Sequence, residues 1–452
     1  MKKILLLCVC VCLAANALAD GKVADLIAQM KGVNPDNLSD RQRLEKSDAL
    51  TDVWKQLVAA GAPAAKEIEK ELEANPADAY FQLSASMALY QIRHEAAHTQ
   101  IIRALQRTSI GDNAFQYFYL CHRIARAKDP AILPVLRRLL ANDKIVVVID
   151  KDWPFIEPRA ICTYLYGVYG PQAVGALKDA CSDENATVRA NAASVIGYFG
   201  DEKPLFVLVD MLARDTDDGV RAAAANALGQ MDHLAVVPRL SQALAADTSE
   251  NVRAACAFAL GELRHEECID PLALAINDTS TQVRQHAISS LEYIGKERCS
   301  EIVANRLAVE DDPAVRLSLI KALGLLGHAK SIPALKAVTE KRSADEAKQA
   351  AQAMHRIDSI GPASREPFPA LEGKKVSASE LNKLLKSLCD RYGDGIEQAQ
   401  KTIYLSAGKD DLPKLDNLRC HVLWVVNNDS IDRLGKISKM IRLVKRKTRD
   451  MI

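Results

Sequence analysis

The chain has 452 residues, and its 59 basic and 58 acidic side chains leave a formal net charge of +1. This balance gives no electrostatic basis for a nucleic-acid partner or another acidic polymer. The sequence contains no GxSxG, P-loop, dinucleotide-binding or EF-hand motif, which disfavours hydrolase, kinase and dehydrogenase chemistry. We therefore expect no catalytic residue, no cofactor and no bound metal.

The N-terminus has the pattern of an export signal. Lys2 and Lys3 precede the apolar run 4–13, and a small-x-small cleavage site follows at 17–19. The run is shorter than the roughly 20 residues that span a bilayer, so an uncleaved anchor is the weaker interpretation. We predict that residues 1–19 are a signal peptide and that the mature chain is periplasmic or secreted. The rest of the sequence contains no transmembrane stretch.

Residues 20–60 are predicted to form N-terminal capping helices, beginning with a short helix at Leu26–Met30. Helix pairs without a strong repeat signature follow. An enlarged turn, Ile145–Phe155, interrupts the third pair and contains Trp153. Long turns between helices are often functional, so this turn either grips a ligand or packs over the edge of the fold.

The sequence His94-Glu95-Ala96-Ala97-His98 matches HExxH, in which two histidines on one helix bind zinc and the glutamate activates water. A zinc-dependent enzyme is therefore an alternative function. Two features count against it: no third ligand follows at a suitable spacing, and residues 93–95 parallel 264–266, where the pattern predicts a turn between repeats.

A repeat dominates the middle of the chain. The dipeptide Val-Arg recurs at intervals of 31 or 32 residues, with its arginines at Arg189, Arg221, Arg253, Arg284 and Arg316. An acid stands six residues before each arginine, at Asp183, Asp215, Asp247, Asp278 and Glu310. Glycine stands eight residues after four of the arginines, and Glu292 takes this place in the fourth repeat.

Each period is predicted to form two helices. In the second helix, small or apolar residues such as Val220, Ala224 and Leu228 recur on one face of a 3.6-residue helix. Prolines such as Pro238 lie near the start of the first helix, where a missing N–H costs little. We predict that each arginine bridges to the acid of its own or a neighbouring turn, as a structural ladder that locks the stacking of repeats.

These residues resemble the HEAT family, especially its short bacterial form, in which an acid, a Val-Arg and an Ala-rich run ending in Leu-Gly recur. The resemblance is most specific over 171–358. It implies an all-α, right-handed α-solenoid of about nine helix pairs over 61–358, with the second helices lining the concave side. Family members are mostly binding scaffolds. A subset acts as bilin lyases and isomerases, a role that an export signal disfavours.

The geometry of the resemblance predicts a partner-binding stripe. Positions two, five and nine residues after each arginine lie within about 60° of one another on the helical wheel, away from the apolar face. Aromatic and hydrogen-bonding groups there suit a protein or peptide partner, although ordinary solvent-facing residues are the other interpretation. The predicted concave stripe comprises Asn191, Ser194, Tyr198, Asn226, Gln230, Phe258, Glu262, His286, Tyr293 and Lys321.

The cysteines are expected to be buried thiols. No CxxC occurs, and Cys162 and Cys256 occupy equivalent apolar positions of two repeats. Cys268 and Cys299 lie one repeat apart, where packed helix axes are about 10 Å apart and a disulfide needs Cα atoms within about 7 Å.

The pattern changes at the end of the chain. Residues 359–375 are predicted to be a linker and 376–452 a small helical module. The segment Lys436–Arg449 has seven basic residues and no acid, so an envelope adaptor that binds anionic polymer or lipid through this tail is a further alternative. A solvated helix face is the simpler interpretation. No feature indicates the oligomeric state.

Overall fold

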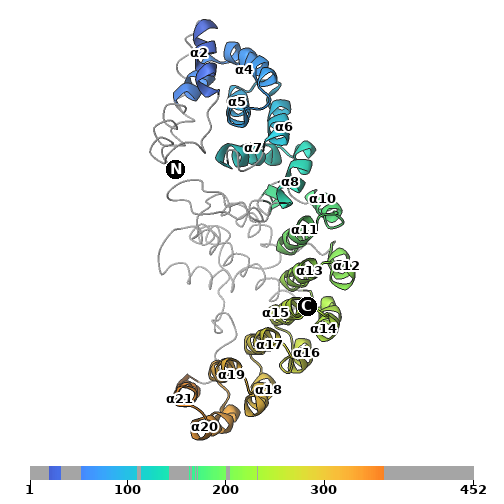
Figure 1. Cartoon of the computed structure of the whole chain (residues 1–452), viewed down its shortest axis with the longest axis vertical. Helices are drawn as coiled ribbons and strands as arrows, with labels where there is room; N and C mark the ends of the chain where they lie inside the picture. The colour runs from blue at the N-terminus through green and yellow to red at the C-terminus, as the bar shows by residue number, and fades with distance from the viewer. Residues whose placement is uncertain are drawn as a thin grey trace, which may run out of the picture. The chain divides into compact units, whose positions relative to one another are not determined.

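The computed structural model describes residues 20–31, 52–108, 114–141, 162, 165–167, 169, 172–199, 204–231 and 233–360. Every element in these ranges is a helix, and the ranges contain no β-strand. The helices follow one another as stacked pairs joined by short turns, so the prediction of an all-α solenoid is confirmed (Figure 1). Among the described helices, none combines the length and the apolar character needed to cross a membrane.

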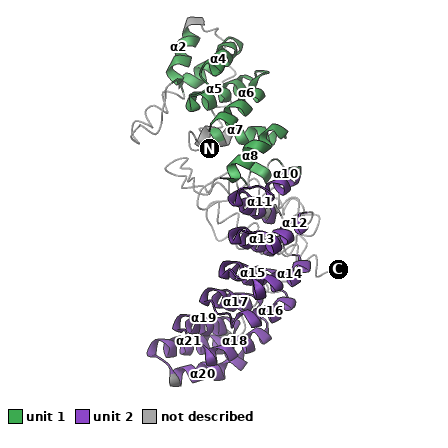
Figure 2. Cartoon of the chain, turned by 45° about the vertical axis from the view of Figure 1, so that its right-hand side comes forward, with its two compact units in different colours: residues 1–173 green, residues 174–452 purple. Residues whose placement is uncertain are grey.

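Several predicted segments fall elsewhere in the chain. The signal peptide, the Ile145–Phe155 turn, the module 376–452 and all but the first two residues of the linker 359–375 lie outside the described residues. The chain divides into two compact units, residues 1–173 and 174–452, which are coloured separately in Figure 2.

Unit 1 contains an N-terminal pair of helices followed by further helix pairs. Its elements are α2 (Asp20–Met30), a helix over 52–60, α4 (Ala62–Ala74), α5 (Ala79–Ile92), α6 (Ala97–Arg107), α7 (Ala114–Arg126), the 3-10 turn η3 (Pro130–Ile132) and α8 (Leu133–Leu140).

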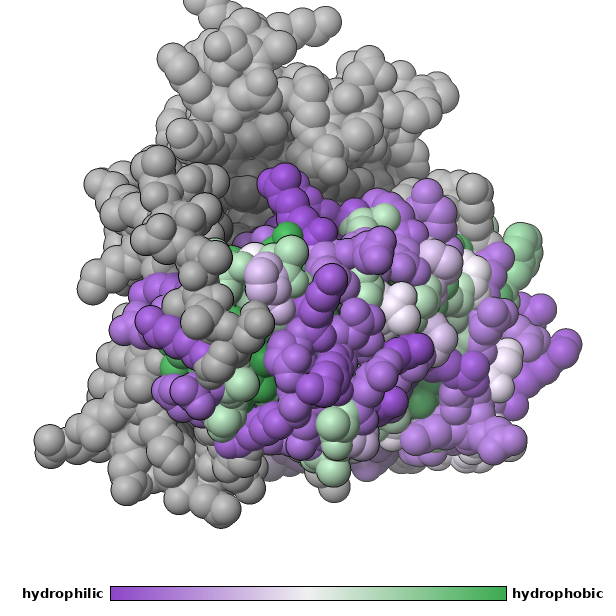
Figure 3. Space-filling view, turned by 90° about the horizontal axis from the view of Figure 1, so that it is seen from above, coloured by the Kyte–Doolittle hydropathy of each residue, from purple (hydrophilic) through white to green (hydrophobic). Residues whose placement is uncertain are grey.

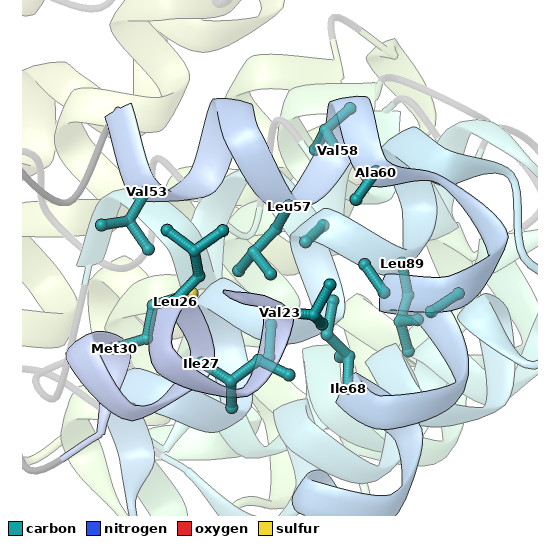
Figure 4. Close-up of a cluster of buried hydrophobic side chains, with 14 of the residues drawn as sticks. Val23, Leu26, Ile27, Met30, Val53, Leu57, Val58, Ala60, Ile68 and Leu89 are labelled. Atoms are coloured by element: carbon teal, nitrogen blue, oxygen red, sulfur yellow. The ribbon is translucent and has the colours of Figure 1, made fainter. Parts of the chain in front are cut away.

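The helix α2 begins earlier than the predicted Leu26–Met30 because its apolar face begins earlier. Val23 lies one turn before Ile27 on the same face, and both are buried. They pack with Leu57, Ile68 and Leu89 in one hydrophobic cluster, which joins α2 and the 52–60 helix to the first helix pair (Figure 4). Seen from the end at which α2 lies, the described surface is largely hydrophilic with small, separate hydrophobic spots (Figure 3). A polar outer face is typical of a capping element.

A single arginine side chain caps the C-terminal end of α6 through hydrogen bonds. Arg138 in α8 donates hydrogen bonds to the carbonyl oxygens of Leu105, Gln106 and Thr108, and to the hydroxyl of buried Tyr117 at 2.9 Å. The last carbonyls of a helix have no partner within the helix, so this side chain satisfies groups that would otherwise be left unpaired.

The described helices of unit 2 form two rows. The first helices of the pairs are α10 (Ala173–Ala180), α12 (Leu205–Arg214), α14 (Val237–Ala246), α16 (Ile269–Ala275), α18 (Glu297–Val309) and α20 (Ile332–Lys341). The second helices are α11 (Ala186–Phe199), α13 (Asp218–Met231), α15 (Glu250–Leu263), α17 (Thr281–Ile294), α19 (Pro313–Leu326) and α21 (Ala344–Ile360). The 3-10 turns η4 (Leu234–Val236), η5 (Glu266–Cys268) and η6 (Ala329–Ser331) lead into α14, α16 and α20. Within unit 2 the second helices line the inner, concave side of the curve (Figure 1).

The repeated glycines let neighbouring second helices approach closely. A Cβ built on Gly229 would lie 2.7 Å from the Cα of Ala259 in the next repeat, closer than real side chains come. The same close approach occurs at Gly197, Gly261 and Gly324. Because small residues face one another here, successive second helices pack with their backbones close together.

The described cysteines lie in the core. All six of them are buried, and Cys121, Cys162, Cys181 and Cys256 are free thiols. Burial raises the pKa of each of these four, that of Cys181 to about 12.

Candidate partner-binding surface

The arginines of the repeat form a ladder that connects successive repeats. Arg221 donates from Nε and Nη2 to the two carboxylate oxygens of Asp247 in the following repeat, at 2.8 and 2.9 Å. Its Nη1 donates to the backbone carbonyl of Asp215, the acid of its own repeat, at 3.0 Å. The same bidentate arrangement pairs Arg189 with Asp215 and Arg253 with Asp278.

Each acid also stabilises its own turn. The carboxylate of Asp247 accepts the backbone N–H of Ser249 at 2.9 Å, just before α15 begins. Asp183, the first acid of the predicted ladder, accepts the N–H of Asn185 in the same way. A carboxylate near a helix N-terminus satisfies unpaired amides and interacts favourably with the helix dipole.

The fourth rung has an additional member. Arg284 donates to Glu310 at 3.1 and 3.4 Å, and Arg306 of α18 donates to the same carboxylate at 2.7 and 3.0 Å. The longer glutamate side chain places its carboxylate between two guanidinium groups.

The last rung uses an acid that the repeat spacing does not reveal. Arg316 pairs with Glu346, a buried residue of α21, whereas Arg342 occupies the position of the acid in the sequence pattern. Glu346 accepts the N–H and the hydroxyl of Ser343 at 3.3 and 2.9 Å. The spacing Ser-x-x-Glu before a helix is a capping box, and this was the available signal in the sequence.

The electrostatics of the ladder favour the ionised forms of its acids and arginines. Burial raises the pKa of Asp247, but the hydrogen bonds from Arg221 and from the Ser249 N–H lower it further, so the net shift is downward. The pKa of Arg221 is raised, mainly by its hydrogen bond to Asp247. These carboxylates stay ionised at neutral pH, and the arginines they bind are fully occupied. The ladder therefore holds repeats together and leaves no group poised for acid–base catalysis.

The predicted concave stripe lies on the second helices, and its members differ in exposure. Phe258 and Lys321 are exposed. The side chain of Tyr198 lies outside the described residues, because only the helical backbone is described there. The other members are partly buried: Asn191, Ser194, Asn226, Gln230, Glu262, His286 and Tyr293.

An aromatic contact bridges two of the second helices. Phe258 of α15 is 42% exposed, and its ring centroid lies 6.3 Å from that of His286 of α17 in an edge-to-face arrangement. Burial lowers the pKa of His286, which keeps the imidazole neutral at physiological pH. The pair offers an apolar surface with a neutral hydrogen-bonding edge.

A second contact joins the same two helices. The guanidinium carbon of Arg264, the residue that ends α15, lies 3.6 Å from the ring centroid of Tyr293. Arg264 is not part of the predicted stripe, because it follows the helix and lies beyond the positions two, five and nine residues after each arginine. The recurrence of glycine at this position, at Gly295 and Gly327, was the available signal.

The HExxH residues do not share one helix. Arg93 ends α5 in the left-handed conformation with φ 61°, and His94 lies in the turn that follows. His94 Nδ1 accepts the N–H of Ala96. His98 lies in the first turn of α6, and its ring stacks on that of Tyr90 in α5. Zinc binding by this motif requires both histidines on one face of a continuous helix. No group of three potential metal ligands is found in the part of the chain that the structure describes.

Comparison with protein families identifies the repeat. The model for HEAT repeats matches residues 143–229, 237–312 and 269–355, and the model for the PBS lyase HEAT-like repeat matches 220–246. A comparison with curated proteins found no match.

Solved structures with a related architecture are distant. Human deoxyhypusine hydroxylase is 18% identical with a TM-score of 0.26, and the match covers 60% of this chain and 99% of that one. The CpcE–CpcF phycocyanin lyase complex from Nostoc sp. PCC7120 is 18% identical with a TM-score of 0.28, covering 58% and 94%. Yeast importin-beta is 13% identical with a TM-score of 0.46, covering 94% and 68%. These values are too low to carry over any property of those proteins.

Proposed function

Residues 143–355 are HEAT repeats, and from that premise we propose that the chain is an exported, non-enzymatic scaffold that binds a protein or peptide partner through its concave stripe. The partner belongs to the cell envelope, as the predicted signal peptide indicates.

The observation that carries the proposal is the Phe258–His286 contact on the concave side. A large apolar ring that remains 42% exposed beside an aromatic neighbour is the kind of group on which binding energy concentrates.

The absence of catalysis is part of the proposal. The charged groups that recur in every repeat are engaged with one another, and the split of His94 from His98 argues against zinc chemistry. Stoichiometric zinc that is lost on His98→Ala would contradict this part of the proposal.

The test compares three baits in envelope extracts of the source organism. They are the mature chain (20–452), a Phe258→Ala/Tyr293→Ala double variant and a Phe206→Ala control. Phe206 lies on α12 in the first row of helices and is 81% exposed, so the control removes a more exposed ring from the other side of the solenoid.

The proposal predicts that mass spectrometry finds proteins retained by the wild type and the control but lost from the folded double variant. Recovery of the same proteins by all three baits would contradict the assignment of the concave stripe.

A further inference from the structure

Arg264 stands where the equivalent repeats place glycine. It ends α15 with φ 49° and ψ 35°, in the left-handed region. Gly295 and Gly327, which end α17 and α19 at the equivalent positions, both have φ 74°. A side chain in this conformation costs about 1 kcal/mol or more, which glycine avoids. Arg93 and Lys128 also have a positive φ, of 61° and 60°, so the conformation alone assigns no task to Arg264. Its contact with Tyr293 of the next repeat is what singles out its guanidinium.

The guanidinium of Arg264 is held in place but not neutralised. It stacks on Tyr293 at 3.6 Å, and its Nε is buried without a hydrogen-bond partner. Within the described ranges the side chain forms no ion pair, in contrast to the saturated arginines of the ladder. Stacking on an aromatic ring fixes the plane of a guanidinium and leaves its outer N–H groups for a planar anion.

A second basic side chain of the concave side also lacks a described counter-ion. Lys321, exposed on α19, has no ion pair with any residue that the structure describes.

The two contacts between α15 and α17 are separated along the axis of α17. His286 and Tyr293 are seven residues apart on α17, which corresponds to about 10 Å along the helix axis. An extended peptide advances about 3.3 Å per residue, so it covers this distance in about three residues.

We propose that the concave stripe recognises an acidic peptide segment, in which a carboxylate binds Arg264 and an apolar side chain about three residues away packs on Phe258. This inference rests on the proposed function and specifies its partner. A carboxylate fits the fork of the guanidinium through two parallel hydrogen bonds, and an apolar side chain fits the exposed ring beside His286.

The test is a selection from a library of short random peptides on the mature chain. Each selected peptide is then resynthesised with its acids replaced by the corresponding amides. Affinities are measured for the wild type, Arg264→Gly, Arg264→Lys, Phe258→Ala and an Arg214→Gln control. Arg214 is an exposed arginine on α12 whose ion pair, among the described residues, is with Asp210 of the same helix, so the control removes the same charge from the other row.

The inference predicts that peptides bound at the stripe contain an acid about three residues from an apolar side chain. Amide replacement and Arg264→Gly should each weaken binding about tenfold or more, Arg264→Lys should recover only part of it, and Arg214→Gln should have no effect. Glycine relieves the backbone strain, so Arg264→Gly should melt no lower than the wild type. This separates a binding role from a structural one.

Three other outcomes overturn the inference and can be told apart. Peptides that lose affinity with Phe258→Ala but tolerate amide replacement and Arg264→Gly would leave the concave scaffold intact and remove the acidic partner. Peptides that are insensitive to both Phe258→Ala and Arg264→Gly would remove the concave site itself. A lowered melting temperature of Arg264→Gly with unchanged affinity would assign Arg264 a purely structural role.

Discussion

The close approach of neighbouring second helices makes one glycine position especially informative. In Gly229→Ala the new Cβ would lie 2.7 Å from the Cα and 2.8 Å from the Cβ of Ala259, whereas ordinary contacts begin at 3.4 Å. The obstacle is helix backbone, so no change of rotamer relieves it. The helices α13 and α15 must separate, and overpacking of this kind costs about 1–3 kcal/mol.

A matched control isolates this steric cost. Gly175 is the third residue of α10, and a Cβ built there meets nothing within 4 Å. Both substitutions gain the helix preference of alanine over glycine, about 0.5–1 kcal/mol, but only Gly229→Ala forces helices apart. We expect Gly175→Ala to raise the free energy of unfolding slightly and Gly229→Ala to lie about 1–3 kcal/mol below it.

Urea unfolding followed by circular dichroism measures this difference. A midpoint for Gly229→Ala that equals or exceeds that of Gly175→Ala would refute the idea that the repeated glycine is a packing requirement.

Three further predictions follow from the ladder and the core. Replacing Asp247 by Asn removes the charge that binds Arg221 and should lower the free energy of unfolding by about 1–3 kcal/mol in urea, whereas no loss would contradict a structural ladder. The pKa of Asp247 is lowered from 3.8 in the folded state, so its contribution to stability is complete above that value and is lost as the pH falls through the lowered pKa. The urea concentration at the midpoint of unfolding should therefore fall as the pH is lowered below about 4, and it should fall less steeply in the Asn variant than in the wild type. Equal pH dependence of the midpoint in the two proteins would count against this. The thiol of Cys256 is buried with a raised pKa, so a thiol reagent should label it only on unfolding. Rapid labelling of Cys256 in the native protein would contradict this burial.

The array was predictable because its signals are periodic. The spacing of Val-Arg, the acids and the glycines fixes the helix pairs, and the apolar positions such as Ala224 and Leu228 are buried in the structure. The sequence also indicated that Arg93-His94-Glu95 is a turn between repeats. The left-handed residue Arg93 supports that interpretation and separates the two histidines of the HExxH match.

The features that escaped prediction depend on exceptions to the period. Glu346 completes the last rung from a position four residues beyond the expected one, where the period gives no signal and only the capping-box spacing from Ser343 indicates it. Which acid each arginine binds was also undetermined, because sequence spacing does not distinguish a rung within a repeat from one between repeats. Arg264 was missed because its stacking on Tyr293 depends on the left-handed turn that ends α15, which sequence spacing does not reveal.

The most direct test of the account asks which face of the solenoid touches the partner. A photoreactive amino acid at Ser289, an exposed position on α17 between His286 and Tyr293, reports on the concave side. The same group at Leu274, which is 74% exposed on α16, reports on the first row of helices. After irradiation in envelope extracts, the account predicts a cross-linked partner from position 289 and none from 274. Cross-links from 274 alone would contradict a concave binding surface.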